Sequence, residues 1–152
     1  MDIRFCLMWF SSRQSLSRNF KQSGSALLFS DYVSRISKFT PCHVSGQSSI
    51  TETGKKGVSL WVCDRGIKSK ELTSEELADR LEKVRDSGVR ELQIAIGGAD
   101  GFSEQDLERL DPDFRWSFGP LTLPHELAAV VASEQIYRAW TIIRKLPYHQ
   151  GH

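Results

Sequence analysis

The chain has 152 residues, of which 39% are hydrophobic and 26% are charged, and its formal net charge at pH 7 is +1. A chain of this size buries a core without disulfides or metals, so we expect residues 1–152 to form one domain. The net charge excludes a general polyanion binder, and a nucleic-acid contact would need a local basic patch or two subunits together.

Membrane and secretory signals are not expected from this sequence. The longest apolar run of its most hydrophobic helix, Leu127–Ala132, is far shorter than the roughly 20 residues that cross a bilayer. The N-terminal stretch has neither the basic flank nor the small-residue cleavage site of a signal peptide. Cys6, Cys42 and Cys63 form no C-x-x-C pair, which favours a reducing cytoplasm.

The first part of the chain predicts a strand and then a helix. The density of Ile, Phe, Leu and Trp in residues 1–10 suits a strand buried on both faces, as in a parallel sheet. Within residues 26–39, one helical face is predicted by the spacing of Leu28, Tyr32, Ile36 and Phe39. The polar stretch 45–57 is the expected flexible connection.

Strands and helices then alternate along the chain. Further strands are predicted over residues 57–66, 91–98 and 115–118. Helices are predicted over residues 72–88 and 103–110. Thr73 and Glu76 stand in capping-box register, and Ser103 is the expected N-cap of the shorter helix. This alternation predicts an α/β domain with a mainly parallel sheet.

Ligands of such sheets bind beyond the carboxyl ends of the strands, which selects three loops: 63–66, 97–101 and 119–124. In the second loop, Gly97, Gly98 and Gly101 allow the backbone to approach a ligand closely. This loop lacks the spacing of a dinucleotide or phosphate motif, so by itself it also fits a plain tight turn.

The third loop, GPLTLP, leads into the most hydrophobic helix. Pro120 and Pro124 restrict the chain, so that backbone groups around Leu121, Thr122 and Leu123 could face a ligand such as an adenine edge. The same loop also fits a simple helix entry.

The helix behind Pro124 is apolar over more than half of its circumference, which predicts a second packing partner besides the sheet, most simply another copy of the chain. On its polar side, Arg138 is placed either for an ion pair with Glu134 or for a phosphate or base contact. The tail adds Tyr148, His149 and His152, which fit either RNA contact or a solvated terminus.

No Ser/His/Asp order, H-E-x-x-H or paired-carboxylate motif stands out, so hydrolases and metalloenzymes have little support and no metal is expected.

The segments IAIGGADG, FGPLTLPHELAAVVASEQIYRAWTI and PYH resemble the ribosomal large-subunit (23S) pseudouridine N3-methyltransferases, a family of small SPOUT methyltransferases. The resemblance is dense from Val58 to His149. It implies a SPOUT-type α/β fold with a C-terminal trefoil knot, which is an exception to the usual topology rules. It also implies methyl transfer from S-adenosylmethionine to N3 of a pseudouridine in large-subunit rRNA, or in the assembled ribosome.

The resemblance further implies where this chemistry occurs. S-adenosylmethionine would lie near Cys63, at Gly98 and along Gly119, Pro120, Leu121, Thr122, Leu123 and Pro124. The enzyme would be a homodimer, because the tail of one subunit approaches the cofactor of the other. Arg138, Tyr148 and His149 would hold the nucleotide, and His125 would orient the loop or remove the N3 proton. The resemblance does not decide whether His125 or His149 is the base that removes the N3 proton.

The chain departs from the family pattern at three places. Cys63 stands where the family has leucine, extra residues surround LDPDF, and the segment before Val58 is short. A second hypothesis is therefore an RNA- or ribosome-binding homodimer without efficient catalysis. A nicotinamide-dependent fold is disfavoured by the missing glycine fingerprint.

Overall fold

The structure is a computed structural model, and it describes residues 1–50 and 55–150. Within these residues the strands are β1 (Asp2–Leu7), β2 (Cys42–Ser45), β3 (Val58–Cys63), β4 (Lys70–Glu71), β5 (Glu91–Ile96) and β6 (Phe114–Ser117). The α-helices are α1 (Ser23–Ile36), α2 (Ser74–Asp86), α3 (Glu104–Leu110) and α4 (His125–Ile143). Short 3-10 helices are η1 (Leu16–Asn19), η2 (Gln47–Ser49) and η3 (Pro147–His149).

The strands form one sheet in the order β2-β1-β5-β3-β6-β4, and each neighbouring pair is parallel. Parallel neighbours need long crossover connections, which here include the helices. The predicted α/β class with a mainly parallel sheet is therefore confirmed. The knot implied by the resemblance stays a prediction.

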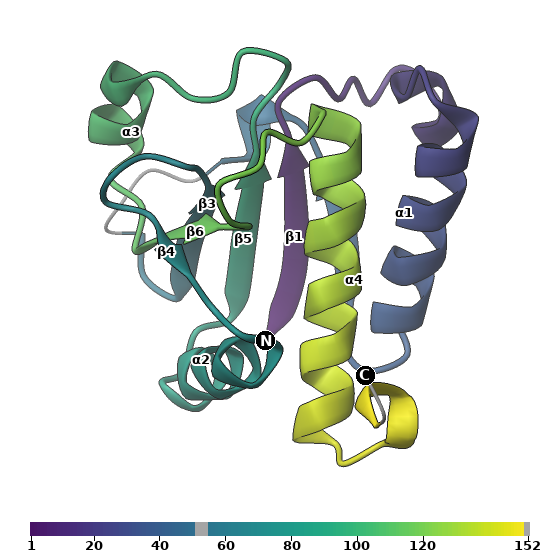
Figure 1. Cartoon of the computed structure of the whole chain (residues 1–152), viewed down its shortest axis with the longest axis vertical. Helices are drawn as coiled ribbons and strands as arrows, with labels where there is room; N and C mark the ends of the chain where they lie inside the picture. Colours follow the sequence, from purple (N-terminus) through teal and green to yellow (C-terminus); the bar gives the residue numbers. More distant parts are fainter. Residues whose placement is uncertain (51–54, 151–152) are drawn as a thin grey trace.

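The sheet is covered on both faces, which explains its apolar strands. Side chains of β1 alternate between the two faces, so that Ile3 and Phe5 pack with α1, α2 and α4, whereas Cys6 packs with α3. Helices α1 and α4 run side by side along the first face (Figure 1). The sheet with its two helical layers, α1, α2 and α4 on one face and α3 on the other, leaves the carboxyl ends of the strands open for a site.

The predicted capping residues of α2 and α3 are confirmed. The Thr73 hydroxyl accepts a hydrogen bond from the Glu76 N–H at 3.1 Å, and the Glu76 carboxylate accepts one from the Thr73 N–H at 3.0 Å. Ser103 forms the same arrangement with Asp106 at the start of α3. Pro124 is the N-cap residue of α4, which begins at His125.

The predicted face of α1 is wrong at Leu28, which is 49% exposed. The buried side chains of α1 include Phe29 and Ile36, because the helix packs on β1 and α4 together and this turns its buried face toward Phe29. Strands β2 and β4 were not predicted. They are short edge strands, and the exposed Lys-Glu sequence of β4 has no hydrophobic pattern to reveal it.

The wide apolar arc of α4 is covered largely within the same chain. Helix α4 packs against the sheet and also against α1 and α2 through residues such as Ala132, Ile136 and Trp140. The arc therefore does not by itself require a second copy.

Parts of two predicted features lie outside the described residues. These are positions 51–54 of the expected flexible connection and His152 of the tail.

Candidate functional site

A cavity lies at the carboxyl ends of three neighbouring strands. The register pairs Cys63 of β3 with Ile96 of β5 and with Trp116 of β6, so the loops after these strands meet. The cavity has a volume of about 730 Å³, which is in the range of small-molecule sites. Its lining consists of residues 63–66, 96–102, 116, 118, 121–125 and 128. The three loops selected from the sequence thus line one cavity.

The loop after β3 supplies a neutral wall and a link to the opposite loop. Burial, and then the charge of Asp64, raise the pKa of the Cys63 thiol, so it stays protonated at neutral pH. Arg65 Nη1 donates a hydrogen bond to Thr122 Oγ1 at 2.8 Å. The sequence predicts the loop that contains Arg65 but not this bond, because a contact across 57 positions leaves no local pattern.

The glycines of the second loop differ in their surroundings. A Cβ atom on Gly97 would lie 2.9 Å from the backbone Cα of Gly101, so the turn has no room for a side chain there. A Cβ atom on Gly98 would meet nothing within 4 Å, and Gly98 lines the cavity. Gly101 has φ of 69°, a conformation that favours glycine. Gly97 and Gly101 therefore shape the turn, while Gly98 leaves space for a ligand.

The third loop divides into two parts. Leu121, Thr122, Leu123 and Pro124 line the cavity, whereas Gly119 and Pro120 line a neighbouring hollow beside β4. Gly119 has φ of 105°, and its N–H donates to Ser117 Oγ at 3.1 Å. Gly119 and Pro120 thus turn the chain toward the cavity.

His125 faces the cavity from the first turn of α4. Its ring packs edge-on against Trp9, with 4.6 Å between the centroids, and its Nε2 lies 3.8 Å from Glu126 Oε2. Glu126 is only 5% exposed and accepts backbone N–H bonds from Lys21 at 2.8 Å and Gln22 at 2.9 Å. These bonds fix the helix start that carries His125. The sequence did not reveal them, because the partners lie 105 and 104 positions apart.

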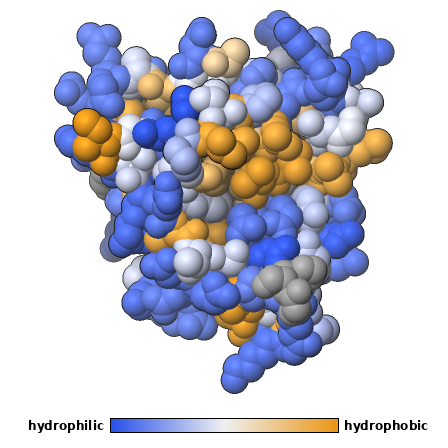
Figure 2. Space-filling view, in the orientation of Figure 1, coloured by the Kyte–Doolittle hydropathy of each residue, from blue (hydrophilic) through white to orange (hydrophobic). Residues whose placement is uncertain are grey.

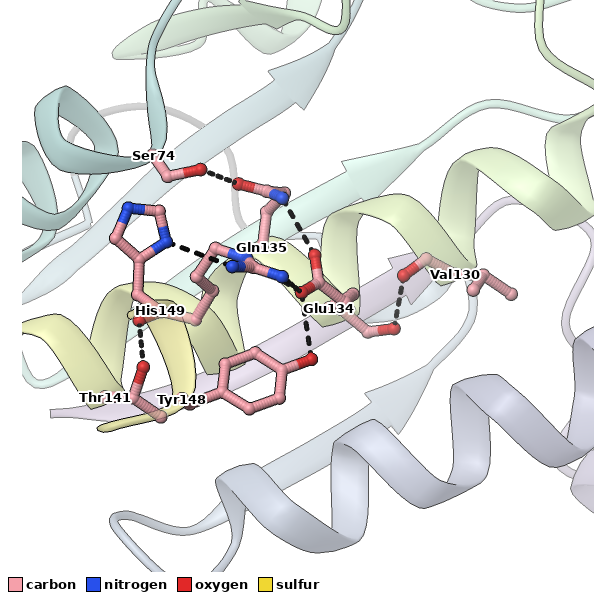
Figure 3. Close-up of polar contacts among 9 residues, drawn as sticks. Ser74, Val130, Glu134, Gln135, Thr141, Tyr148 and His149 are labelled. Carbon is pink, nitrogen blue, oxygen red and sulfur yellow. Dashed lines mark hydrogen bonds and ion pairs between the residues drawn. The ribbon is translucent and has the colours of Figure 1, made fainter. Parts of the chain in front are cut away.

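The other predicted site residues form a second group, here called the tail cluster. Figure 3 shows most of its members where η3 folds back on α4, close to the start of α2. The tail cluster consists of Ser74, Glu75, Glu134, Gln135, Arg138, Tyr148 and His149.

Glu134 and Arg138 form the centre of the tail cluster. Arg138 places Nε 2.9 Å and Nη2 2.7 Å from Glu134 Oε1, and the Tyr148 hydroxyl donates to the same oxygen at 3.1 Å. Arg138 Nη1 contacts His149 Nδ1 at 3.0 Å. Burial, followed by a hydrogen bond with Tyr32 and the charge of Glu134, raises the pKa of Tyr148. The ion pair between Arg138 and Glu134 that the spacing allowed is confirmed, and Tyr148 and His149 contact it.

The cavity and the tail cluster are well separated within one chain. Arg138 follows His125 by 13 positions along α4, which is about 20 Å of helix. The structure therefore groups His125 with the cavity loops, and it groups Arg138, Tyr148 and His149 away from them. Ser74, Glu75 and Gln135 join the tail cluster without having been predicted.

In residues 1–50 and 55–150, no group of three or more His, Cys, Asp or Glu side chains could hold a metal ion. None of the helices described there is long and apolar enough to cross a membrane.

The cavity loops and the tail cluster both lie in a segment of the chain that is similar to known proteins. A family model described as a predicted SPOUT methyltransferase matches residues 43–149. This match covers most of the chain and includes the cavity loops and the tail cluster. The chain belongs to the SPOUT methyltransferase family.

Similar curated proteins carry one name, ribosomal RNA large subunit methyltransferase H. The protein from Koribacter versatilis (strain Ellin345) is 35% identical over 139 residues, which cover 87% of this chain and 92% of that protein. Those from Psychrobacter sp. (strain PRwf-1) and Bartonella bacilliformis (strain ATCC 35685 / KC583 / Herrer 020/F12,63) are 48% and 46% identical over 60% of this chain. In these two alignments the chain spans about half the length of the curated relatives it matches, 54% in each case.

Among solved structures, a probable methylase family protein from Haemophilus influenzae Rd KW20 has a similar fold. The TM-score is 0.58 at 11% sequence identity, and the match covers 99% of this chain and 71% of that chain. At this identity the likeness supports the fold alone.

Proposed function

We propose that this chain transfers a methyl group from S-adenosylmethionine to N3 of a pseudouridine in large-subunit (23S) ribosomal RNA. One observation carries the proposal: three loops that are distant in sequence, all within the region matched by the family model, line a single cavity. The names of the relatives support the RNA substrate, since they describe methyltransferases of large-subunit ribosomal RNA.

The cavity fits a nucleoside-containing methyl donor. Its volume of about 730 Å³ suits a molecule of that size. Cys63 offers a neutral wall to an adenine, Gly98 leaves open space beside its backbone, and the loop of residues 121–124 can offer backbone groups to the base edge. When bound, S-adenosylmethionine would supply an electrophilic methyl group.

The residues of this chain have two tasks in the transfer. They hold the acceptor nitrogen in line with the methyl group, and they assist loss of the weakly acidic N3 proton. His125 lines the cavity and can accept a proton there. Arg138 and Tyr148 present a cation and an aromatic ring, which are groups suited to an RNA phosphate and base.

A homodimer would unite these two sets of residues. The tail cluster lies about 20 Å along α4 from the cavity of its own chain. In a twofold dimer with the two α4 helices antiparallel, the tail of one subunit approaches the cavity of the other. Figure 2 shows hydrophobic residues gathered over parts of α4 and α1. Leu27, Leu28 and Leu127 are exposed on these helices and would be covered in such a dimer.

The proposed compartment is the cytoplasm. Cys6, Cys42 and Cys63 are free thiols, which suits a reducing environment.

Calorimetry and methylation assays test the proposed function. We expect saturable binding of S-adenosylmethionine and S-adenosylhomocysteine, followed by methyl transfer to large-subunit RNA lacking this modification. Naked rRNA, isolated subunits and whole ribosomes should be compared as substrates. Binding without methylation of any of them would favour a binding homodimer, and no binding at millimolar ligand would reject both functions.

Mixing two impaired variants tests the composite site. In a heterodimer of Gly98→Val and Arg138→Ala, one site pairs an intact cavity with an intact tail from the partner. An equal, fully exchanged mixture should therefore regain about a quarter of the wild-type activity, since half of the dimers are mixed and each has one good site. If each tail served its own cavity, the mixture would show only the average of the two impaired activities.

A further inference from the structure

The first turn of α2 closes a ring of hydrogen bonds through the tail cluster. The Ser74 hydroxyl donates to Gln135 Oε1 at 2.7 Å, and Gln135 Nε2 donates to Glu134 Oε2 at 2.8 Å (Figure 3). On the other side, Glu75 Oε1 lies 2.7 Å from His149 Nε2. Ser74 and Glu75 are consecutive, so both arms of the ring start from one helix end.

This ring fixes the tautomer of His149. A guanidinium nitrogen can only donate, so Arg138 Nη1 donates to His149 Nδ1 across 3.0 Å. His149 Nδ1 is then the acceptor, and the ring proton is on Nε2, from which it is donated to the Glu75 carboxylate. Both nitrogens of His149 are therefore engaged in the tail cluster.

The tautomer separates the roles of the two histidines. A general base needs a lone pair that reaches the proton it removes. The lone pair of neutral His149 is taken up by Arg138, whereas His125 lies at the cavity with its ring against Trp9. This leaves His125 as the better placed base and gives His149 an orienting role.

We propose that Glu75 is a positioning residue for the methylation reaction: through the Nε2–H of His149 it sets the direction from which Arg138 meets the RNA. The inference rests on the proposed function. Glu134 binds the Arg138 guanidinium on one side and His149 binds it on the other. The remaining N–H groups of Arg138 therefore point in a fixed direction. The hydrogen bond from His149 also lowers the pKa of the Glu75 carboxyl group, which keeps the acceptor ionised.

Nitrogen NMR of histidine-labelled protein tests the first step without any RNA. We expect the His149 signals of the wild type to report a proton on Nε2 and an unprotonated Nδ1 near neutral pH. Glu75→Ala should remove this preference, whereas Glu75→Gln should keep it, because its amide oxygen still accepts the bond. A proton on Nδ1 of neutral His149 in the wild type would overturn the inference.

Methylation kinetics test the second step. We expect Glu75→Ala to lower kcat/KM for the RNA by about fivefold, as for the loss of one partly exposed charged hydrogen bond, with unchanged affinity for S-adenosylhomocysteine. Glu75→Gln should recover most of the activity. Asp79→Ala is the matched control, since it removes a carboxylate one turn further along α2 that pairs with Lys83.

The two proposals fail in different ways. If the wild type methylates and Glu75→Ala is as active as Asp79→Ala, the role of Glu75 is overturned while the proposed function stands. The hydrogen-bond account is equally overturned if Glu75→Gln is as impaired as Glu75→Ala. A wild type that binds the cofactor but methylates no RNA rejects the proposed function, and the NMR result still decides the tautomer.

Discussion

The two ends of α4 are built in different ways. At its start, the cavity is formed by the turns of three loops, in which Gly98 leaves space and Cys63 stays neutral beside charged side chains such as Arg65. At its end, the tail cluster is formed by contacts between charged and polar side chains, with Arg138 held between Glu134 and His149. The first region is suited to enclosing a small molecule, and the second to presenting a fixed cation and aromatic group to a larger partner.

The largest expected effect tests the cavity. Gly98 lines the cavity, and Gly98→Val places a branched side chain into the open space beside it. The fold should therefore persist while the ligand is blocked. We expect the affinity for S-adenosylhomocysteine to fall by about a hundredfold, which corresponds to roughly 3 kcal/mol of steric conflict. Calorimetry measures this change, with circular dichroism as the control for folding. Unchanged affinity would contradict the assignment of the cavity.

The next effect tests the other end of α4. Arg138→Ala should leave the affinity for S-adenosylhomocysteine unchanged and lower methylation by about tenfold to a hundredfold, as for the loss of one arginine contact to RNA. Arg109→Ala is a suitable control, because it removes an arginine from an exposed i,i+3 ion pair with Asp106 on α3. Methylation rates and calorimetry on the same samples separate the two steps. A matching loss of cofactor affinity would show that the two regions are not independent.

A third prediction distinguishes two adjacent glycines. Gly97→Ala brings a Cβ atom within 2.9 Å of the Gly101 backbone, so the turn must shift. We expect the free energy of unfolding to fall by about 1 to 3 kcal/mol in urea titrations, which is the usual cost of overpacking. Gly98→Ala is the matched control and should be close to the wild type, since its Cβ meets open space. Equal stability of both variants would contradict the description of this turn.

The smallest effect concerns the sheet that joins the two regions. Burial raises the pKa of the Cys6 thiol from 9.0 to about 12. As the pH rises past the unfolded value, the unfolded chain loses this proton while the folded chain keeps it, so stability falls. The loss should be about 1 kcal/mol between about pH 8 and pH 10 for this thiol. Cys6→Ala should show a correspondingly weaker pH dependence in urea titrations, and an identical dependence would contradict the raised pKa.

Local patterns predicted much of the fold. Apolar runs located β1, β3 and β5, and the capping residues Thr73 and Ser103 located the starts of α2 and α3. These signals act within one strand or one helical turn, so neighbouring residues reveal them. The exposed Leu28 shows the limit of such patterns, because the buried face of α1 depends on the position of α4.

The candidate site was predictable where backbone geometry determines it. Glycines and prolines free or restrict the chain locally, so neighbouring residues are enough to select the loops 97–101 and 119–124. The sequence could not show that Gly119 and Pro120 lie outside the cavity lining, since this depends on how the loop crosses the sheet edge. It also did not indicate the backbone partners of Glu126, which are more than a hundred positions away.

The sequence by itself determined the alternation of strands and helices, the three loops at the strand ends and the family motifs, because each of these is written in neighbouring residues. Only the tertiary structure decided that His125 lies at the cavity while Arg138 and His149 lie at the other end of α4. It also decided that Glu75 meets His149 across 74 positions of the chain. Such contacts depend on how α2, α4 and the tail pack together, and no local pattern encodes that packing.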